Sequence, residues 1–251
     1  MMHVNSLSVG SRLLPLSFDA KPGEVIHVIG PNGSGKSTLL SAVAGLLDCQ
    51  GDIELDGVNL NHVSIAQLAD YRAFLIQSDR PAFNLEVAHY LALSIPANSA
   101  NSAQEIEQVV VELAETLAVK DKLHRSVHQL SGGEWQRVRL CAICLQVWPT
   151  LNPYAKLLIL DEPAAPLDIG QEALLYQLIE KDAAMGLTVL MSNHDLNRTL
   201  KHADRAILLD KGVMQAFGSV EEVLSPERLA SVFNTPVQRV QVGNKQILLF
   251  D

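Results

Sequence analysis

The sequence predicts an α/β fold: a core with a parallel sheet, an N-terminal antiparallel β-subdomain and an inserted α-helical subdomain. Three observations predict it. Apolar, strand-like runs at residues 187–191 and 205–209 alternate with short helical patterns, which is typical of a parallel sheet. A glycine-rich segment at residues 30–38 lies between an apolar run and a helical one. Residues 78–147 change to helical periodicity.

The N-terminal elements come first in the chain. A β-rich stretch extends to about residue 29, and Lys21-Pro22-Gly23 predicts the turn before its last strand. After the first helix, residues 52–59 alternate around Asp56-Gly57, which is a hairpin signal. We therefore expect an antiparallel β-subdomain beside the glycine-rich segment.

The later elements divide the rest of the chain. Residues 103–114 show a clear helical period, and the two prolines of 148–153 end the last helix of the insertion. Residues 238–250, around Gly243-Asn244, predict a closing hairpin. We expect a single domain over residues 1–251. Its core would comprise residues 1–77 and 148–251, with the helical subdomain at 78–147.

Composition limits the class of protein. The chain has 251 residues, 48% hydrophobic and 19% charged, with a formal net charge of −9, which suits one large core and excludes a disordered chain. The clustered Lys and Arg of a nucleic-acid surface are missing, so we expect no nucleic-acid partner. The sequence shows no secretory signal and no apolar stretch approaching the ~18 residues of a membrane helix. We expect a cytosolic protein, for which any membrane role must come through a partner.

The glycine-rich segment has the pattern G-x-x-x-x-G-K-[ST] of a phosphate loop. Its glycines let backbone N–H groups turn toward phosphate oxygens at a helix N-terminus. The sequence therefore predicts a P-loop NTPase core that binds ATP through Gly30, Pro31, Asn32, Gly33, Ser34, Gly35, Lys36, Ser37 and Thr38. Lys36 would neutralise phosphate charge, Ser37 would ligate Mg²⁺, and Thr38 would bond the α-phosphate.

Further motifs follow in a fixed order. They are LSGGEWQR at 130–137, KLLILDEP at 156–163, LD at 167–168 and SNH at 192–194. In this order they resemble the signature motif, Walker B strand, D-loop and switch histidine of the ATP-binding cassette (ABC) ATPases, and the resemblance covers essentially the whole chain. Gln77, after the apolar run 73–76, is similar to the Q-loop residue of that family.

The resemblance implies a role for each matching residue. Asp161 would hold Mg²⁺ through a water, Glu162 would act as general base or orient the attacking water, and His194 would bond the γ-phosphate. Gln77 would sense the metal and the water. Simpler interpretations remain open: the two acids could end a strand facing solvent, Gln77 could be an ordinary exposed polar residue, and a lone histidine is often structural.

The signature residues Ser131, Gly132 and Gly133 lie in the predicted helical subdomain, away from their own phosphate loop. The family joins two cassettes head to tail, so that these residues complete the partner's γ-phosphate site. With a single set of motifs, the chain is expected to form a homodimer. The alternative, a glycine-rich helix cap, is disfavoured by the Glu-Trp-Gln-Arg that follows.

Some positions depart from the family pattern. Glu134 replaces the usual Gln and places a carboxylate near a triphosphate, although it could point away. Pro166 stands where the D-loop usually has a small residue. No aromatic residue lies at 6–16 to stack on adenine, so Arg12 is the candidate for stacking, with a plain surface arginine as the alternative. Cys141 and Cys144 form a C-x-x-C that we interpret as buried apolar residues.

Two classes of function compete. The first is the ATPase subunit of an ABC importer, most similar to the cobalamin (vitamin B12) branch, with haem and siderophore importers as neighbours. It implies two integral-membrane permease subunits, indirect action of a periplasmic substrate-binding protein, and a peripheral position on the cytoplasmic face of the inner membrane. The second is a soluble cassette ATPase for iron–sulfur assembly. A nucleotide kinase would leave the signature unexplained.

Residues 81–91, with Phe83, Leu85 and Tyr90, are the candidate permease contact, with internal packing as the alternative.

Overall fold

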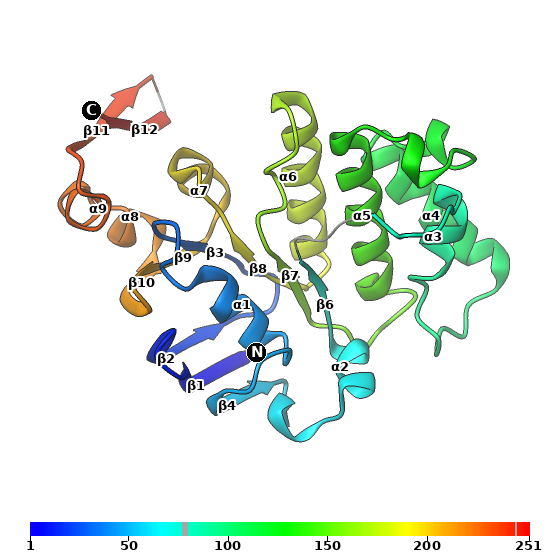
Figure 1. The fold of residues 1–251 in the computed structure, drawn as a ribbon, viewed down its shortest axis with the longest axis horizontal. Helices are drawn as coiled ribbons and strands as arrows, with labels where there is room; N and C mark the ends of the chain where they lie inside the picture. Colours follow the sequence, from blue (N-terminus) through cyan, green and yellow to red (C-terminus); the bar gives the residue numbers. More distant parts are fainter. Residues whose placement is uncertain (77–79, 244) are drawn as a thin grey trace. The chain divides into compact units, whose positions relative to one another are not determined.

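The computed structural model describes residues 1–76, 80–243 and 245–251 (Figure 1). The chain divides into two compact units: Met1–Val63 with Leu190–Asp251, and Ser64–Val189. The predicted helical insertion, 78–147, falls within the second unit. None of the helices in the described part of the chain combines the length and the apolar character needed to cross a membrane.

The first unit begins with an antiparallel sheet in the strand order β2-β1-β4-β5. The bounds are β1 (Met2–Val9), β2 (Leu13–Ala20), β4 (Gln50–Leu55) and β5 (Val58–Asn59), followed by a 3₁₀ turn at Leu60–His62. Leu55 pairs with Val58 across Asp56 and Gly57, which both adopt positive φ. This confirms the hairpin predicted at residues 52–59.

The parallel strands of the first unit carry the phosphate loop. Strand β3 (Val25–Ile29) is fully buried and pairs in parallel with β9 (Arg205–Asp210), while β10 (Val213–Ser219) pairs antiparallel with β9. Strand β8 (Thr188–Ser192) lies next to β3 and ends in this unit. Helix α1 (Lys36–Val43) follows β3. The order strand, glycine-rich loop, helix is the one that the sequence predicts.

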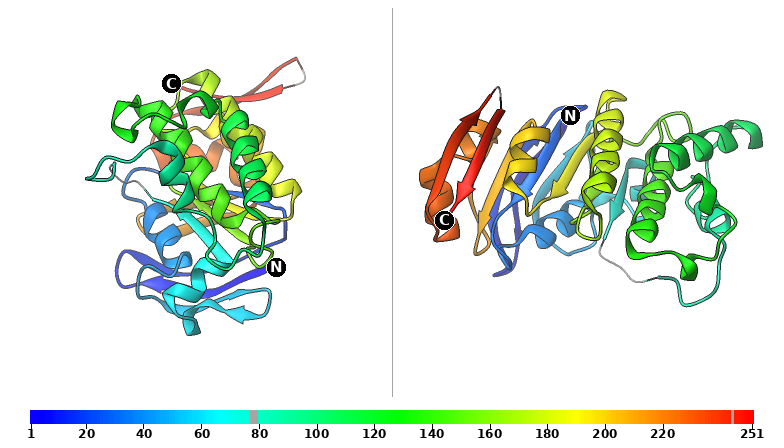
Figure 2. Two further views of the ribbon diagram at one scale, coloured as in Figure 1. Left: turned by 90° about the vertical axis from the view of Figure 1, so that its right-hand side faces the viewer. Right: turned by 90° about the horizontal axis from the view of Figure 1, so that it is seen from above.

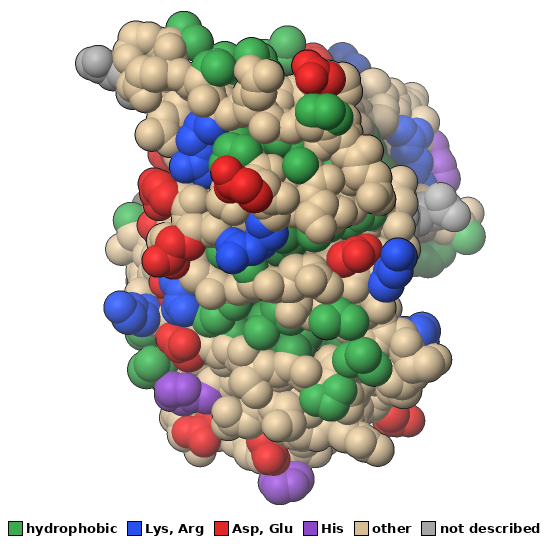
Figure 3. Space-filling model, turned by 90° about the vertical axis from the view of Figure 1, so that its left-hand side faces the viewer, with side chains coloured by type: hydrophobic (Ala, Val, Ile, Leu, Met, Phe, Trp, Pro, Cys, Tyr) green, Lys and Arg blue, Asp and Glu red, His purple; other side chains and the backbone are tan. Residues whose placement is uncertain are grey.

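The C-terminal part of the first unit closes over a core centred on Ile29 and Leu208. Its elements are α7 (Leu196–His202), α8 (Val220–Val223), α9 (Pro226–Phe233), β11 (Val237–Val242) and β12 (Lys245–Phe250). Strands β11 and β12 form the predicted closing hairpin, at the edge of this unit (Figure 2). On the face in Figure 3, hydrophobic side chains lie at the top and again lower down, with charged side chains between them. In the β11–β12 hairpin, Val242, Leu249 and Phe250 are exposed.

The second unit combines a parallel strand pair with helices. Its elements are α2 (Ile65–Tyr71), β6 (Arg72–Leu75), α3 (Val87–Ala92), α4 (Ala103–Thr116), α5 (Gly132–Val147), β7 (Leu157–Leu160) and α6 (Ile169–Ala184), with 3₁₀ turns at Lys120–Lys122 and Val127–Gln129. Strands β6 and β7 pair in parallel. Helix α4 contains the predicted 103–114 pattern, and α5 ends directly before Trp148 and Pro149, as the prolines predict.

Helix α5 forms the centre of the second unit. The guanidinium of Arg137 donates hydrogen bonds of 2.7 Å and 2.8 Å to the carbonyls of Leu117 and Ala118, which end α4. Cys141 and Cys144 are buried, as predicted, and the described residues hold no cluster of three metal-ligating side chains. The Cys144 thiol lies 3.3 Å from Oδ2 of Asp182, a carboxyl on α6 with no exposed surface.

Candidate nucleotide site

The phosphate loop takes its shape from glycine conformations that other residues rarely adopt. Gly30 has a φ of 146°, and a Cβ there would lie 2.1 Å from the carbonyl oxygen of Leu209. Gly33 and Gly35 also have positive φ, and a Cβ on Gly33 would meet open space. The loop therefore needs glycine at position 30 for close packing and has an open side at position 33.

Two neighbouring turns of the first unit support the loop. The Gly212 N–H donates a 2.9 Å hydrogen bond to the carbonyl of Ser34, and the Leu14 N–H donates a 2.8 Å bond to the carbonyl of Gly212. The Arg12 carbonyl lies 3.3 Å from the position of a Cβ on Gly35. The backbone of Arg12 is thus beside the phosphate loop, and its side chain is exposed. Its stacking on adenine stays a prediction.

The polar groups of the loop fit a phosphate ligand. The Lys36 ammonium is buried and donates bonds of 2.9 Å and 3.0 Å to the carbonyls of Gly30 and Pro31. The Ser34 hydroxyl is buried without a hydrogen-bond partner among the described residues. A buried cation and an unsatisfied hydroxyl beside a glycine cradle are suited to phosphate oxygens. Ser37 and Thr38 follow in the first turn of α1, with Ser37 exposed.

The predicted switch histidine follows β8. Asn193 N–H donates a 3.1 Å hydrogen bond to the carbonyl of Val28, on the strand that leads into the phosphate loop. His194 itself is exposed. The first unit therefore places the His194 turn beside β3.

In the second unit, the predicted Walker B carboxylates end a buried strand. All four residues of β7 are buried, and the Asp161 N–H donates a 2.9 Å bond to the carbonyl of Leu75 at the end of β6. Asp161 and Glu162 are partly exposed. Glu162 has a φ of 48°, in the left-handed region that disfavours a residue with a side chain. Such a conformation at a polar residue is common at functional sites.

The signature residue Ser131 is a helix cap, which the sequence analysis wrongly disfavoured. Its hydroxyl accepts the Glu134 N–H at 3.2 Å, and the Glu134 carboxylate accepts the Ser131 N–H at 2.8 Å. This capping box begins α5. Ser131 is nevertheless exposed, and its hydroxyl hydrogen is not used by the cap, so both roles are compatible.

The departure at Glu134 has a local explanation. The Ser131 backbone N–H holds the pKa of the Glu134 carboxyl below its ordinary value, helped by the hydroxyl of Ser131 and by Lys122. The Lys122 ammonium lies 3.4 Å from Oε1 of Glu134. The carboxylate is thus kept anionic and is engaged by the helix start and by a cation.

The D-loop segment packs against the same helix start. A Cβ on Gly133 would lie 2.3 Å from Oε1 of Gln171 and 3.3 Å from the carbonyl of Pro166, and the Gln136 amide donates a 2.9 Å bond to the carbonyl of Pro163. A side chain at position 133 would therefore have to displace the Gln171 amide, while a Cβ on Gly132 would meet open space. Pro166 takes part through its carbonyl.

Gln77 lies outside the described residues. Arg80, which the sequence analysis did not single out, donates hydrogen bonds to the carbonyls of His128, at 3.2 Å, and Leu130. Arg80 is thereby hydrogen-bonded to the signature loop. No sequence signal distinguishes this arginine from a surface one, because carbonyl acceptors are set by the fold.

Each unit has an accessible oxygen donor of a kind that suits Mg²⁺. Mg²⁺ prefers oxygen ligands, usually one or two carboxylates or hydroxyls with substrate phosphates and water. The Ser37 hydroxyl in the first unit and the Asp161 carboxylate in the second are accessible oxygen donors of this kind.

Comparisons with known proteins agree with these motifs. A profile of the ABC transporter family matches residues 13–165. Over 251 residues the chain is 62% identical to the vitamin B12 import ATP-binding protein BtuD of Vibrio atlanticus, covering 100% of both chains. The chain is also 58% identical to the vitamin B12 import ATP-binding protein BtuD of Vibrio cholerae serotype O1, and the alignment again covers 100% of each chain.

A solved structure extends the comparison to the fold. It is described as a metal-chelate-type ABC transporter in an inward-facing conformation, and it matches with a TM-score of 0.78 at 24% identity over 100% of this chain and 96% of that one. At this identity the likeness shows the fold alone, and it confirms the predicted α/β class.

Proposed function

The chain belongs to the ABC transporter family, and from that premise we propose that its ATP hydrolysis drives vitamin B12 import through separate permease subunits. The ATPase activity follows from the family. The substrate is supported by one observation above the others, the 62% identity over the full length of a vitamin B12 import ATP-binding protein. No observation favours the iron–sulfur assembly alternative.

Each residue of the phosphate loop has a defined task in this proposal. On ATP binding, the Lys36 ammonium exchanges the carbonyls of Gly30 and Pro31 for phosphate oxygens, and the Ser34 hydroxyl gains a partner. Thr38 bonds the α-phosphate. The exchange is favourable because a charge-assisted bond to phosphate is stronger than one to a neutral carbonyl.

The carboxylates and the histidine complete the reaction site. Glu162 accepts a proton from, or orients, the attacking water, while His194 bonds the γ-phosphate. Ser37 and Asp161 would hold Mg²⁺, which supplies neutralisation of phosphate charge, and Gln77 would contact metal and water. Arg12 would stack on adenine.

We propose a homodimer in which Ser131, Gly132 and Gly133 of one chain meet the nucleotide on the phosphate loop of the other. Two observations support it. Ser131 is exposed, and a Cβ on Gly132 would meet no atom within 4 Å, so the helix start offers open N–H groups. Ile169, the residue after the D-loop aspartate, is 81% exposed, which suits an interface.

The permease contact is proposed at the segment 81–91 and the hollow that follows it. The Tyr90 ring packs at a tilt of 56° against Trp135, with ring centroids 4.9 Å apart, and Leu91 is buried, so part of the segment packs internally. Phe83 and Leu93, by contrast, are 63% and 72% exposed. These two side chains are the apolar anchors that a docked helix needs.

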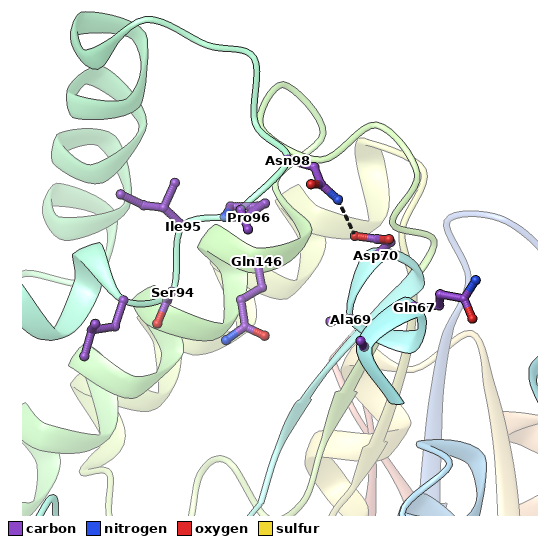
Figure 4. Close-up of a pocket in the computed structure, with 11 residues that line it drawn as sticks. Gln67, Ala69, Asp70, Ser94, Ile95, Pro96, Asn98 and Gln146 are labelled. Atoms are coloured by element: carbon purple, nitrogen blue, oxygen red, sulfur yellow. Dashed lines mark hydrogen bonds between the residues drawn. The ribbon is translucent and has the colours of Figure 1, made fainter. Parts of the chain in front are cut away.

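A cavity of about 480 Å³ lies beside Leu93, between α2, residues 93–98 and Gln146 of α5. Figure 4 shows the Asn98 amide directed at Asp70, with a hydrogen bond of 3.5 Å. Leu93, Ile95 and Pro96 line the cavity with apolar surface. It suits the ridge of a permease helix, and such docking would hold the protein at the cytoplasmic face of the membrane.

The substrate is tested with the assembled transporter. The chain is co-expressed with its cognate permease, purified in detergent and reconstituted in liposomes with the matching substrate-binding protein. We expect ATP-dependent uptake of cobalamin and no uptake of haem or ferric siderophore. Uptake of haem or ferric siderophore in place of cobalamin would overturn the proposal that cobalamin is the substrate. Co-purification with a soluble iron–sulfur scaffold and no permease would overturn the transport function.

A further inference from the structure

The strand that leads into the phosphate loop carries a histidine with no exposed surface. His27 is at the centre of β3, one residue before Val28, which accepts the Asn193 N–H. Helix α7 packs on β3. From α7, the Thr199 hydroxyl oxygen comes within 3.0 Å of His27 Nδ1, and from the end of β8 the Asn193 amide nitrogen comes within 3.4 Å.

These contacts extend to both neighbours of His194. The Asn193 side-chain oxygen accepts the Asp195 N–H at 3.0 Å, which turns the amide nitrogen of Asn193 toward His27. The Thr199 hydroxyl donates to the Asp195 carbonyl at 3.1 Å. The buried ring of His27 therefore contacts the side chains of Asn193 and Thr199, and each of these also bonds the backbone of Asp195.

The ring is suited to this position because it stays neutral. Burial, with a smaller effect of the nearby His202, lowers the pKa of His27 to about 3. A neutral imidazole carries one N–H. Because the Thr199 hydroxyl uses its hydrogen on the Asp195 carbonyl, its oxygen accepts the Nδ1–H of His27 at 3.0 Å, and the Asn193 amide nitrogen lies at the longer distance of 3.4 Å. Asn193 and Thr199 are themselves buried, so the network is shielded from water.

We propose that His27 is a positioning residue for His194: it fixes the turn Asn193–Asp195 against the phosphate-loop strand and so aims the exposed imidazole of His194. The inference rests on the proposed role of His194 at the γ-phosphate. His27 touches no nucleotide and takes no proton. Misplacing a reacting group by about 1 Å costs up to a hundredfold in rate, so loss of His27 should reduce kcat more than ATP affinity.

The test compares three substitutions in the full-length chain. His27→Leu removes the nitrogen, His27→Asn restores an amide at the place of Nδ1, and Ile26→Val trims a neighbouring buried residue of β3 without touching the network. We expect His27→Leu to lower kcat about 10- to 100-fold with KM for ATP within about twofold. His27→Asn should recover most of kcat, and Ile26→Val should leave it unchanged.

Double variants distinguish positioning from general support. On a His194→Ala background, His27→Leu should produce no further loss in single-turnover hydrolysis. An equal loss on both backgrounds, or a loss of kcat in Ile26→Val as large as in His27→Leu, would overturn the inference. If His27→Leu does not fold, Thr199→Val tests the same link, and unchanged kcat in that variant would count against it.

The same set separates the inference from the role on which it rests. If His194→Ala hydrolyses ATP at the native rate, the role of His194 is wrong and the positioning inference is wrong with it. If His194→Ala is inactive while His27→Leu keeps native kcat, only the positioning inference is wrong.

Discussion

Glu162 is the side chain on which the proposed hydrolysis depends most directly. Replacing it with Gln keeps the size and removes the base. We expect ATP binding to be retained and hydrolysis to fall by about 10²–10⁴, the usual contribution of a positioned general base. Equilibrium binding of a fluorescent ATP analogue and phosphate release measure the two effects.

The matched control for Glu162 is Glu107→Gln, an exposed carboxylate on α4. It should leave phosphate release unchanged. Native turnover in Glu162→Gln would remove Glu162 from its role, and equal losses in both variants would point to a charge effect unrelated to the site.

Asp182 should make the stability of the protein depend on pH. Burial raises the pKa of its carboxyl from 3.8 to about 7, while the Cys144 thiol and Lys181 have smaller, opposing effects. Between these values the folded state binds more protons than the unfolded one, so the free energy of unfolding falls as pH rises from about 4 to about 7. Above that range the loss is complete.

Asp182→Asn removes this dependence because an amide does not titrate. We expect the variant to match the native protein near pH 4 and to be more stable by a few kcal/mol at pH 8, since each pKa unit corresponds to about 1.4 kcal/mol. Urea unfolding at several pH values measures it. Parallel stability curves for the two proteins would contradict the expectation.

The structural roles of individual residues differ in how well the sequence predicts them. Lys36 and its loop are predicted because the motif is contiguous and its glycines have fixed tasks. His27 and Asp182 are not, because their environments come from α7 and α5, far away in the sequence. For Ser131, the sequence analysis predicted the signature role and disfavoured the helix cap. The cap could have been predicted, because Glu134 lies three residues after Ser131, which is the spacing of a capping box.

Among the elements, the C-terminal hairpin is hydrogen-bonded to α7 through the side chain of Asn197. The Asn197 amide on α7 donates to the Leu248 carbonyl at 3.0 Å and accepts the Leu248 N–H at 2.7 Å. Asn197→Ala leaves these groups without their partner, so we expect faster amide exchange throughout β11 and β12 and slight global destabilisation. Hydrogen exchange by mass spectrometry measures it. Gln246→Ala, exposed on β12, is the control, and equal protection in the two variants would contradict the prediction.

The segment around α3 gives the prediction for membrane coupling. Phe83→Asp and Leu93→Asp place charges on exposed apolar anchors, so we expect weaker co-purification with the permease and lost uptake, with ATP binding retained. Leu249→Asp, on the exposed side of the hairpin, is the control and should co-purify normally. Undiminished association of a Phe83→Asp, Leu93→Asp double variant would exclude this surface.

The short hairpins are the elements that the sequence predicts most directly. Asp56-Gly57 supplies the positive φ that the β4–β5 turn needs, and alternating side chains flank it. Helix α5 is harder to delimit from its pattern, because it is buried on nearly all sides and shows little amphipathic contrast. Its start is given by the capping residue and its end by Pro149.

At the scale of the whole molecule, the proposed dimer can be tested by complementation. Lys36→Ala damages the phosphate loop and Ser131→Arg damages the signature. If the motifs act in trans, a heterodimer of the two single variants holds one native site and one doubly damaged site. A heterodimer of the double variant with the native chain has both sites damaged.

We therefore expect the first heterodimer, isolated with two affinity tags, to keep up to about half of native hydrolysis, unless the two sites must act together. ATP occupancy of each chain, measured by photolabelling, resolves that case: only the Ser131→Arg chain should bind in a native site. Greater occupancy and activity in the second heterodimer would show that the motifs act in cis.

The left-handed backbone at Glu162 has a consequence for selection experiments. For a residue with a side chain, this φ costs about 1 kcal/mol or more of folding free energy. A glycine at position 162 would adopt the same φ at little cost. A library screened for heat resistance alone should therefore enrich glycine or asparagine at this position, and the survivors should be inactive. Heat-resistant clones that still hydrolyse ATP should keep the glutamate and gain their resistance elsewhere. Thermal stability and ATP hydrolysis therefore favour different residues at position 162.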